Sequence, residues 1–221
     1  MRAGMSGVKN FRDAGGVGPL RRGVLYRSGA LHELSAQDAR SLAGLGVRTV
    51  VDLRSTPEVA ARPDALHGLG FELLHAPVFA EQAWPDDQLE LYPSMAEHAG
   101  RSVVAVVRRL LAADGPPVLV HCASGKDRTG VVVAVLQTLL GASEAEVTQD
   151  FLRSNAELSL TGPVSSSGSA HGTRSVAATH LRRALVWIRS HHGSVPGYLV
   201  AHGAEESELR ALFRLAARTS G

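Results

Sequence analysis

Short apolar runs alternate with stretches of helical spacing in the first part of the chain. Four runs have the length and composition of strands: residues 24–27, 47–53, 71–78 and 116–122. The last of them, PPVLVHC, has the unbroken apolar character of a central strand covered on both faces. Between the first two, Ser35 and Asp38 form a capping pattern that predicts a helix ending near Gly46. This alternation predicts an α/β sandwich in which helices flank a central, mostly parallel sheet.

The rest of the chain has mainly helical spacing. Helices are predicted over residues 101–115, 129–141, 143–158, 176–193 and 205–219. The helix at 129–141 is apolar nearly all round, which indicates that it is buried. Residues 79–100 are predicted to form a loop with some helical character, and SVPGYL (194–199) to form a turn between the last two helices.

One stretch of low complexity interrupts this pattern. Residues 161–175 are rich in Ser and Gly and too small and polar to pack, which predicts a flexible segment, either a mobile lid or a slack connection. The chain has 221 residues and no internal repeat. We therefore expect a single domain over residues 1–221.

Composition narrows the cellular setting and the partners. One cysteine cannot form an intramolecular disulfide, and no apolar run reaches the roughly 18 residues of a membrane span. The first residues contain no signal-peptide core, so a cytoplasmic protein is predicted, with secretion without a cleavable signal left open. The 23 basic and 21 acidic residues give a net charge of +2 with no long run of one sign, which argues against a nucleic-acid partner. Oligomeric state is left open.

The single cysteine lies in the stretch HCASGKDRTG, between the apolar strand and the buried helix. A loop in that position points successive backbone N–H groups into a concave nest at a positive helix end, which suits a phosphate dianion. Arg128, six residues after Cys122, can grip two phosphate oxygens at once. The predicted phosphate-binding residues are Ala123, Ser124, Gly125, Lys126, Asp127, Arg128 and Thr129.

The same environment activates the cysteine. A thiol at a helix N-terminus beside an arginine is favoured as the thiolate, so Cys122 is a candidate nucleophile. Thr129 could donate its hydroxyl to that sulfur, and His121 is expected to brace the loop. A nucleotide-binding P-loop is excluded, because Asp127 replaces the required Ser or Thr and Val120 stands where the first glycine should be.

HCASGKDRTG resembles the active-site loop of the cysteine-dependent tyrosine phosphatases, and its GKDRTG part is similar to their atypical bacterial branch. Further motifs along the chain are similar to that branch and occur in the order that the branch uses: NFRDAGG, LYRSGAL, DFLRSN and GSVPGYL. The resemblance implies a cysteine-phosphatase fold and hydrolysis of phosphate monoesters through a phosphocysteine on Cys122, without a metal or another cofactor. It implies phosphotyrosine-type protein substrates, with dual specificity or phosphoinositides open, and Lys126 is similar to a lysine of lipid-directed members.

The general acid that such chemistry requires has two candidates. Asp127 lies inside the loop and matches the branch, so it is the first choice. Asp86, in the sequence WPD, has the letters and rough position of the acid loop of larger tyrosine phosphatases, and Asp87 could substitute for it. Asp127 could also form only a structural ion pair.

Other charged residues are candidates for supporting roles. Asp52 and Arg54 follow a predicted strand end, where α/β folds place ligand-facing groups, although Arg54 could simply pair with Glu58. The same two interpretations, a ligand-facing role or structural bracing, apply to Asn10, Arg12 and Asp13 of the NFRD motif and to Arg27.

The aromatic residues expected at the rim are few, namely Phe79, Trp84 and Tyr92. The stretch before the loop is short for a helical lid, so a small phosphorylated metabolite, such as a nucleotide or sugar phosphate, is an alternative substrate. A non-catalytic phosphate-binding module is a further alternative, and a sulfurtransferase is disfavoured by the KDRTG sequence.

Overall fold

In the computed structural model, the described residues are 5, 7–81, 84–161 and 173–217, and within them five strands form one sheet. The strands are β1 (Arg12–Asp13), β2 (Leu25–Ser28), β3 (Thr49–Asp52), β4 (Glu72–His75) and β5 (Val118–His121). Their order across the sheet is β1-β2-β5-β3-β4; β1 pairs antiparallel with β2, and the other pairs are parallel. The predicted, mostly parallel sheet is confirmed, with β5 at its centre.

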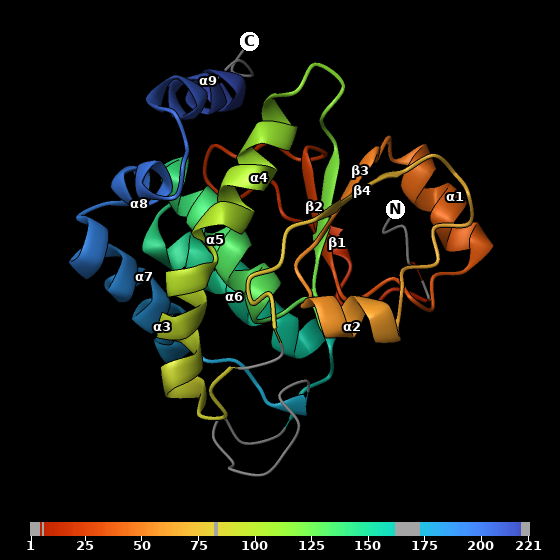
Figure 1. The fold of residues 1–221 in the computed structure, drawn as a ribbon, viewed down its shortest axis with the longest axis horizontal. Helices are drawn as coiled ribbons and strands as arrows, with labels where there is room; N and C mark the ends of the chain where they lie inside the picture. Colours follow the sequence, from red (N-terminus) through yellow and green to blue (C-terminus); the bar gives the residue numbers. More distant parts are fainter. Residues whose placement is uncertain (1–4, 6, 82–83, 162–172, 218–221) are drawn as a thin grey trace.

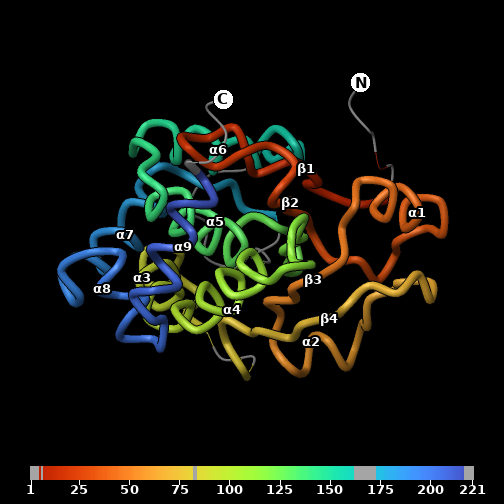
Figure 2. Tube along the Cα trace, turned by 90° about the horizontal axis from the view of Figure 1, so that it is seen from above, coloured from red at the N-terminus to blue at the C-terminus, as the bar shows by residue number. Residues whose placement is uncertain are grey.

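Helices cover both faces of this sheet (Figures 1 and 2). They are α1 (Ala36–Gly44), α2 (Thr56–Ala61), α3 (Gln88–His98), α4 (Gly100–Leu111), α5 (Arg128–Leu139), α6 (Glu144–Glu157), α7 (Ala178–His192), α8 (Val195–Ala201) and α9 (Glu206–Ala217). Helix α1 lies on one side of the sheet, and α3 to α9 lie on the other, with α5 between the sheet and α6 and α7 (Figures 1 and 2). The sandwich predicted from the sequence is therefore present.

The central strand contributes side chains to two separate cores. Val118 and Val120 of β5 belong to the larger core with α4 and α5, whereas Leu119 belongs to the smaller core beneath α1, with Leu42. Successive side chains of a strand point to opposite faces, so a strand buried on both faces needs apolar residues at every position. This explains why the run before Cys122 is apolar without alternation.

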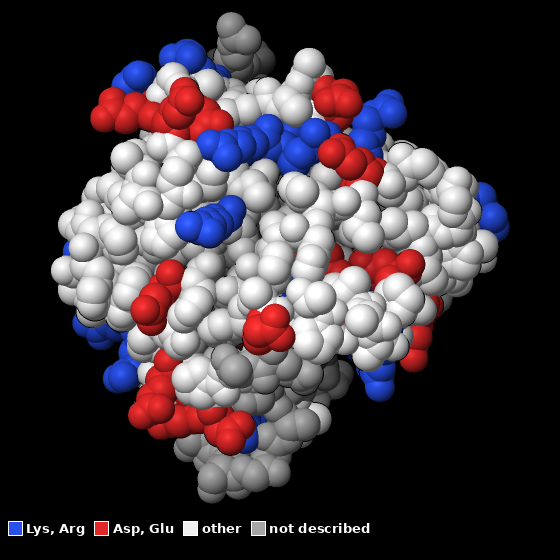
Figure 3. Space-filling model, in the orientation of Figure 1, with Lys and Arg blue, Asp and Glu red and all other residues white. Residues whose placement is uncertain are grey.

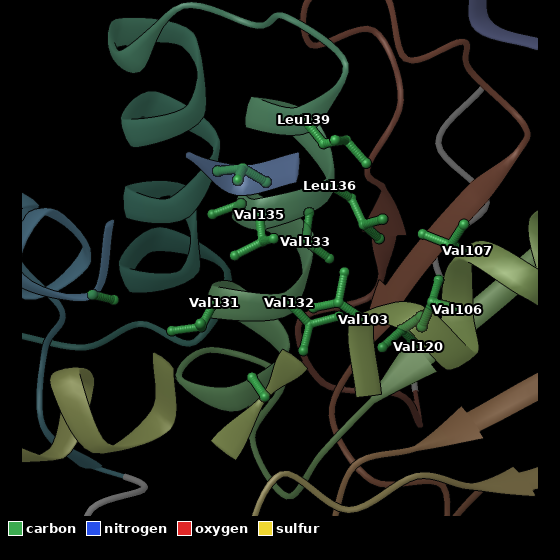
Figure 4. Packing of buried hydrophobic residues seen from close by; sticks show 14 of the residues in the cluster. Val103, Val106, Val107, Val120, Val131, Val132, Val133, Val135, Leu136 and Leu139 are labelled. Atoms are coloured by element: carbon green, nitrogen blue, oxygen red, sulfur yellow. The ribbon is translucent and has the colours of Figure 1, made fainter. Parts of the chain in front are cut away.

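Helix α5 is buried nearly all round, as its sequence predicts. Ten of its residues are buried, and Val132 lies against Val103 of α4 and Val120 of β5 (Figure 4). Each fully buried valine stabilises the fold by about 2 kcal/mol relative to an exposed one. Because this helix begins at Arg128, dense packing on both sides of the loop fixes where the loop starts and ends.

Two predictions about local structure need correction, and one strand was missed. The supposed turn at 194–199 is the start of α8: Ser194 accepts a hydrogen bond from the Gly197 N–H (3.1 Å), and a proline is tolerated in the first helical turn. The loop at 79–100 contains the regular helix α3, which Asp87 caps. Strand β1, only two residues long, was not predicted.

The low-complexity segment at 161–175 lies largely outside the described residues, which leave out 162–172. Basic and acidic side chains intermix over the face of the molecule in Figure 3. Among the described helices, none has both the length and the apolar composition needed to cross a bilayer.

Candidate active site

Cys122 follows directly on β5, and the loop from Cys122 to Asp127 leads into α5. The carboxyl ends of the parallel neighbours β2 and β3 lie at the same edge of the sheet, which is where ligands bind in open α/β sheets. Cys122 is a free cysteine with only 1% of its surface exposed. The edge therefore holds a single buried thiol surrounded by residues from three strand ends.

The backbone of the loop is oriented by donors from outside it. Three consecutive carbonyls accept such hydrogen bonds: that of Ala123 from the Ala30 N–H (3.0 Å), that of Ser124 from Asn10 (3.3 Å), and that of Gly125 from Asn10 (2.8 Å) and Arg27 (2.9 Å). In a planar trans peptide the C=O and the next N–H point in opposite directions. The N–H groups of Ser124, Gly125 and Lys126 therefore point away from this scaffold, as the predicted anion-binding nest requires.

Gly125 is required for this path of the backbone. Its φ is +70°, a region that residues with a side chain rarely adopt. A Cβ at this position would lie 2.2 Å from the carbonyl oxygen of Ser28. The glycine thus allows the loop to turn while it presses against the end of β2.

Buried charges support the loop from behind. Arg27 donates from Nη1 to Asp150 (3.1 Å), and Arg12 donates from Nε to the same carboxylate (3.3 Å) and also hydrogen-bonds the side chain of Asn10. Burial raises the pKa of Asp150, but the two guanidinium groups outweigh it and hold the pKa below its ordinary value. Residues of the NFRD, LYRS and DFLRSN motifs therefore form one hydrogen-bonded network. This network holds the side chains of Asn10 and Arg27 where they donate to the loop.

Arg128 is held by Glu58 and Trp84. Its Nη1 and Nη2 donate to the two carboxylate oxygens of Glu58 at 2.5 and 2.8 Å, and its Cζ lies 5.1 Å from the ring centroid of Trp84. Burial opposes the charged form, but the bonds to Glu58 and the negative charges of Cys122, Glu58 and Asp127 prevail and raise the pKa of Arg128. Arg128 is therefore a permanent cation beside the thiol.

Asp127 lies at the start of α5 and accepts two hydrogen bonds. Tyr92 donates its hydroxyl to Oδ1 (2.6 Å), and Lys126 donates from Nζ to Oδ2 (2.6 Å). Burial and the charges of Asp127 and Cys122 raise the pKa of Tyr92 well above its ordinary value, so its hydroxyl stays protonated and remains a donor. Lys126 is completely buried, with its ammonium at this carboxylate.

The second candidate acid lies in a segment that also reaches the loop. Asp86 is exposed, and its backbone carbonyl accepts a hydrogen bond from Arg174 (2.7 Å). Two residues earlier, Trp84 contacts Arg128 as described above. Asp87 caps α3 through its side chain (2.8 Å to the Leu89 N–H) and is thereby occupied. The WPD segment therefore borders the site, with Asp86 at the surface.

Asp52, Arg54 and His121 lie together beneath the loop, with a partner that the sequence did not reveal. Arg54 pairs with Asp52 (2.7 Å) and Asp64 (2.9 Å), not with Glu58. Nε2 of His121 lies 2.9 Å from Oδ2 of Asp64 without the geometry of a hydrogen bond, and Asp64 also accepts from the Leu31 N–H (3.1 Å). Burial opposes ionisation, but His121 and Arg54 lower the pKa of Asp64.

This cluster is also where a cation could be considered. The ligand-type atoms of Asp52, Asp64 and His121 lie within 4.8 Å of one another. Arg54 already donates to both carboxylates, so its guanidinium supplies the positive charge that a bound cation would otherwise provide. The cluster is accounted for as a buried ion-pair network that braces the strand ends.

Two of the aromatic residues expected at the rim are buried instead. Tyr92 is 0% and Phe79 is 5% exposed, and Tyr92 packs edge-on against Phe151 (5.9 Å) and stacks with His180 (5.0 Å). Only Trp84 is partly accessible. The hydroxyl of Thr129 is buried and has no hydrogen-bond partner among the described residues.

Comparison with known proteins agrees with this geometry. The profile of the tyrosine phosphatase family matches residues 3–216. The chain is 28% identical over 214 residues to a tyrosine-protein phosphatase of Nostoc commune, covering 86% of this chain and 72% of that protein. It is 32% identical over 194 residues to the triple specificity protein phosphatase PtpB of Mycobacterium tuberculosis, covering 68% of each.

Among solved structures, Pseudomonas aeruginosa TpbA overlaps 92% of this chain and 100% of its own with a TM-score of 0.48 and 21% identity. The match to the family profile extends over nearly the whole chain, including the loop and the three motifs that support it. The chain therefore belongs to the tyrosine phosphatase family and is a phosphoric monoester hydrolase.

Proposed function

We propose that the chain hydrolyses phosphotyrosine-type protein substrates through a phosphocysteine intermediate on Cys122. The observation that carries this proposal is the orientation of the loop: outside donors hold the carbonyls of Ala123, Ser124 and Gly125, so that the next three N–H groups point away from those donors. With Arg128, these groups would bind the three non-bridging phosphate oxygens and stabilise the charge that develops on them.

In the first step the Cys122 thiolate attacks phosphorus, the S–P bond forms, and the bond from phosphorus to the substrate oxygen breaks. Asp127 gives its proton to the departing oxygen. In the second step water attacks the phosphocysteine, Asp127 takes a proton from it, and the S–P bond breaks to release phosphate and the thiolate. Thr129, whose hydroxyl has no hydrogen-bond partner in the described part of the chain, would donate to the departing sulfur.

Lys126 would connect binding with this proton transfer. Its ammonium donates to Oδ2 of Asp127 (2.6 Å). A phosphate dianion in the loop would compete for that ammonium and free Oδ2 for the leaving oxygen. Asp86 is the second candidate for the same role, because Trp84 brings its segment against Arg128. The whole of residues 1–221 would form the one phosphatase domain.

Phosphate release by wild type and Cys122→Ser over one panel tests the proposal. The panel comprises an aryl phosphate, phosphotyrosine and phosphothreonine peptides, phosphoinositides and nucleotide monophosphates. We expect turnover by wild type alone, fastest on the phosphotyrosine peptide. Binding of phosphate esters without release would support a phosphate-binding module, and preference for a nucleotide would support a metabolite phosphatase.

A further inference from the structure

A cavity of about 380 Å³ adjoins the catalytic loop on the side of α2. Ala123, the residue after the nucleophile, forms part of its wall, and so does Glu58, the partner of Arg128. From there the cavity extends to Lys9 before β1, His32 after β2 and Arg62 at the end of α2. A substrate with its phosphate in the loop would therefore have a neighbouring group at the cavity mouth.

Some charged side chains in the cavity wall form ion pairs, and others do not. Arg54 and Glu58 are engaged in the ion pairs described above, with Asp52 and Asp64 and with Arg128. Lys9 and Arg62 are exposed, and neither side chain has a hydrogen bond or an ion pair to any described residue. The wall also holds the exposed carboxylate of Glu33, so its residues without a Lys or Arg ion pair are two cations and one anion, and the cations are in excess.

A third group in the wall has unused hydrogen-bonding capacity. Nδ1 of His32 is buried and has no hydrogen-bond partner among the described residues, and Nε2 of the same ring lies 3.8 Å from Glu33. A buried polar atom without a partner is costly, and an incoming ligand atom can satisfy it. Two free cations and an unsatisfied ring nitrogen therefore surround one cavity.

We infer that this cavity binds an acidic side chain next to the phosphorylated residue of the substrate. The inference rests on the proposed function, since it assigns the flanking sequence of the phosphotyrosine. Lys9 and Arg62 would attract the carboxylate, and their exposure would make the preference sensitive to salt. The site would set specificity without taking part in the chemical steps.

Two matched phosphotyrosine peptides test this inference, one with Glu on both sides of the phosphotyrosine and one with Gln. The measured quantity is the ratio of kcat/KM for the Glu peptide to that for the Gln peptide. We expect a ratio above one in wild type, lowered about two- to fivefold by Lys9→Ala or Arg62→Ala, as for exposed ion pairs. The double variant should bring the ratio near one, and added salt should lower it in wild type.

Arg40→Ala is the control, because Arg40 is an exposed cation on α1 outside the cavity wall. A ratio of one in wild type, no change in the double variant, or an equal drop in Arg40→Ala would overturn the subsite. Turnover of neither peptide, nor of an aryl phosphate, would overturn the proposed function instead. Binding of the two peptides to Cys122→Ser would then still decide whether the cavity selects the acidic one.

Discussion

Glu58 receives both terminal nitrogens of Arg128, one on each carboxylate oxygen, at 2.5 and 2.8 Å. Oε2 of Glu58 also accepts from the N–H and hydroxyl of Ser55, as part of the capping box of α2. Burial would raise its pKa, yet Arg128 and Ser55 lower it below the ordinary value. The carboxylate thus fixes the plane of the guanidinium and connects α2 with the catalytic loop.

Glu58→Gln should therefore impair phosphate binding without removing a reacting group. The amide can accept on one oxygen only, so Arg128 loses its two-point support and its geometry relaxes. We expect kcat/KM on an aryl phosphate to fall about tenfold, since small misplacements of binding groups are costly. Glu146→Gln is the control, because Glu146 completes the capping box of α6 and pairs with no catalytic residue. Equal losses in both variants would show that only helix capping had been disturbed.

The general acid can be assigned by its leaving-group dependence. Asp127→Asn should lower kcat/KM on phenyl phosphate, which reports only the first chemical step, by about 10² to 10⁴, because the phenolate then leaves without a proton. The loss should be much smaller on dinitrophenyl phosphate, whose leaving group needs none. Asp86→Asn, at the surface, should keep the wild-type dependence on both esters. If the two variants exchange these behaviours, the acid is Asp86 and Asp127 is a structural partner of Lys126.

Tyr92 should position Asp127 for proton transfer. Tyr92→Phe keeps the ring between Phe151 and His180 but removes the donor to Oδ1. The carboxylate is then held by Lys126 alone, so kcat/KM on phenyl phosphate should fall about tenfold, with a much smaller loss on dinitrophenyl phosphate. Tyr198→Phe is the matched control, because Tyr198 is equally buried but donates to the Ala96 carbonyl (2.5 Å). It should destabilise the fold by about 1 kcal/mol and leave kcat/KM on both esters unchanged. Unchanged values in Tyr92→Phe as well would remove the positioning role.

The parts of the site that the sequence predicted are local. The apolar run before Cys122, Gly125 and the apolar helix after Arg128 specify a strand, a turn and a buried helix within one short segment, so the nest and its residues follow from neighbours in the chain. The same local reasoning failed at α8, where Pro and Gly suggested a turn although Pro suits the first turn of a helix.

The residues that support the loop could not be predicted because their partners are distant in the sequence. Asp64 lies in a loop that gives no local signal, and its role depends on β3 and β5 being adjacent and parallel. Glu58 had a plausible local partner in Arg54, and only tertiary structure decides that it pairs with Arg128. The buried Tyr92 was attributed to the rim because the regularity of α3 was not recognised.

Asp150 should stabilise the fold near neutral pH, and its protonation should contribute to the loss of stability in acid. It is buried, and it faces both Arg12 and Arg27, so Asp150→Ala leaves two buried guanidinium groups without their common partner. We expect a loss of about 3 kcal/mol in the free energy of unfolding, the usual result of breaking a buried ion pair. The exposed pair of Glu144 and Arg189 is the control, and Glu144→Ala should cost about 0.5 kcal/mol or less.

The dependence on pH follows from the lowered pKa of Asp150. Its stabilisation is complete above the ordinary aspartate pKa of about 3.9 and is lost as the pH falls through the lower pKa of the folded protein. Urea unfolding between pH 6 and about pH 2.5 should therefore show wild-type stability falling on acidification, with a shallower fall in Asp150→Ala. Parallel curves for the two proteins would mean that Asp150 does not couple proton binding to unfolding, and the acid sensitivity would then have to come from Glu58 and Asp64, whose pKa values are also lowered.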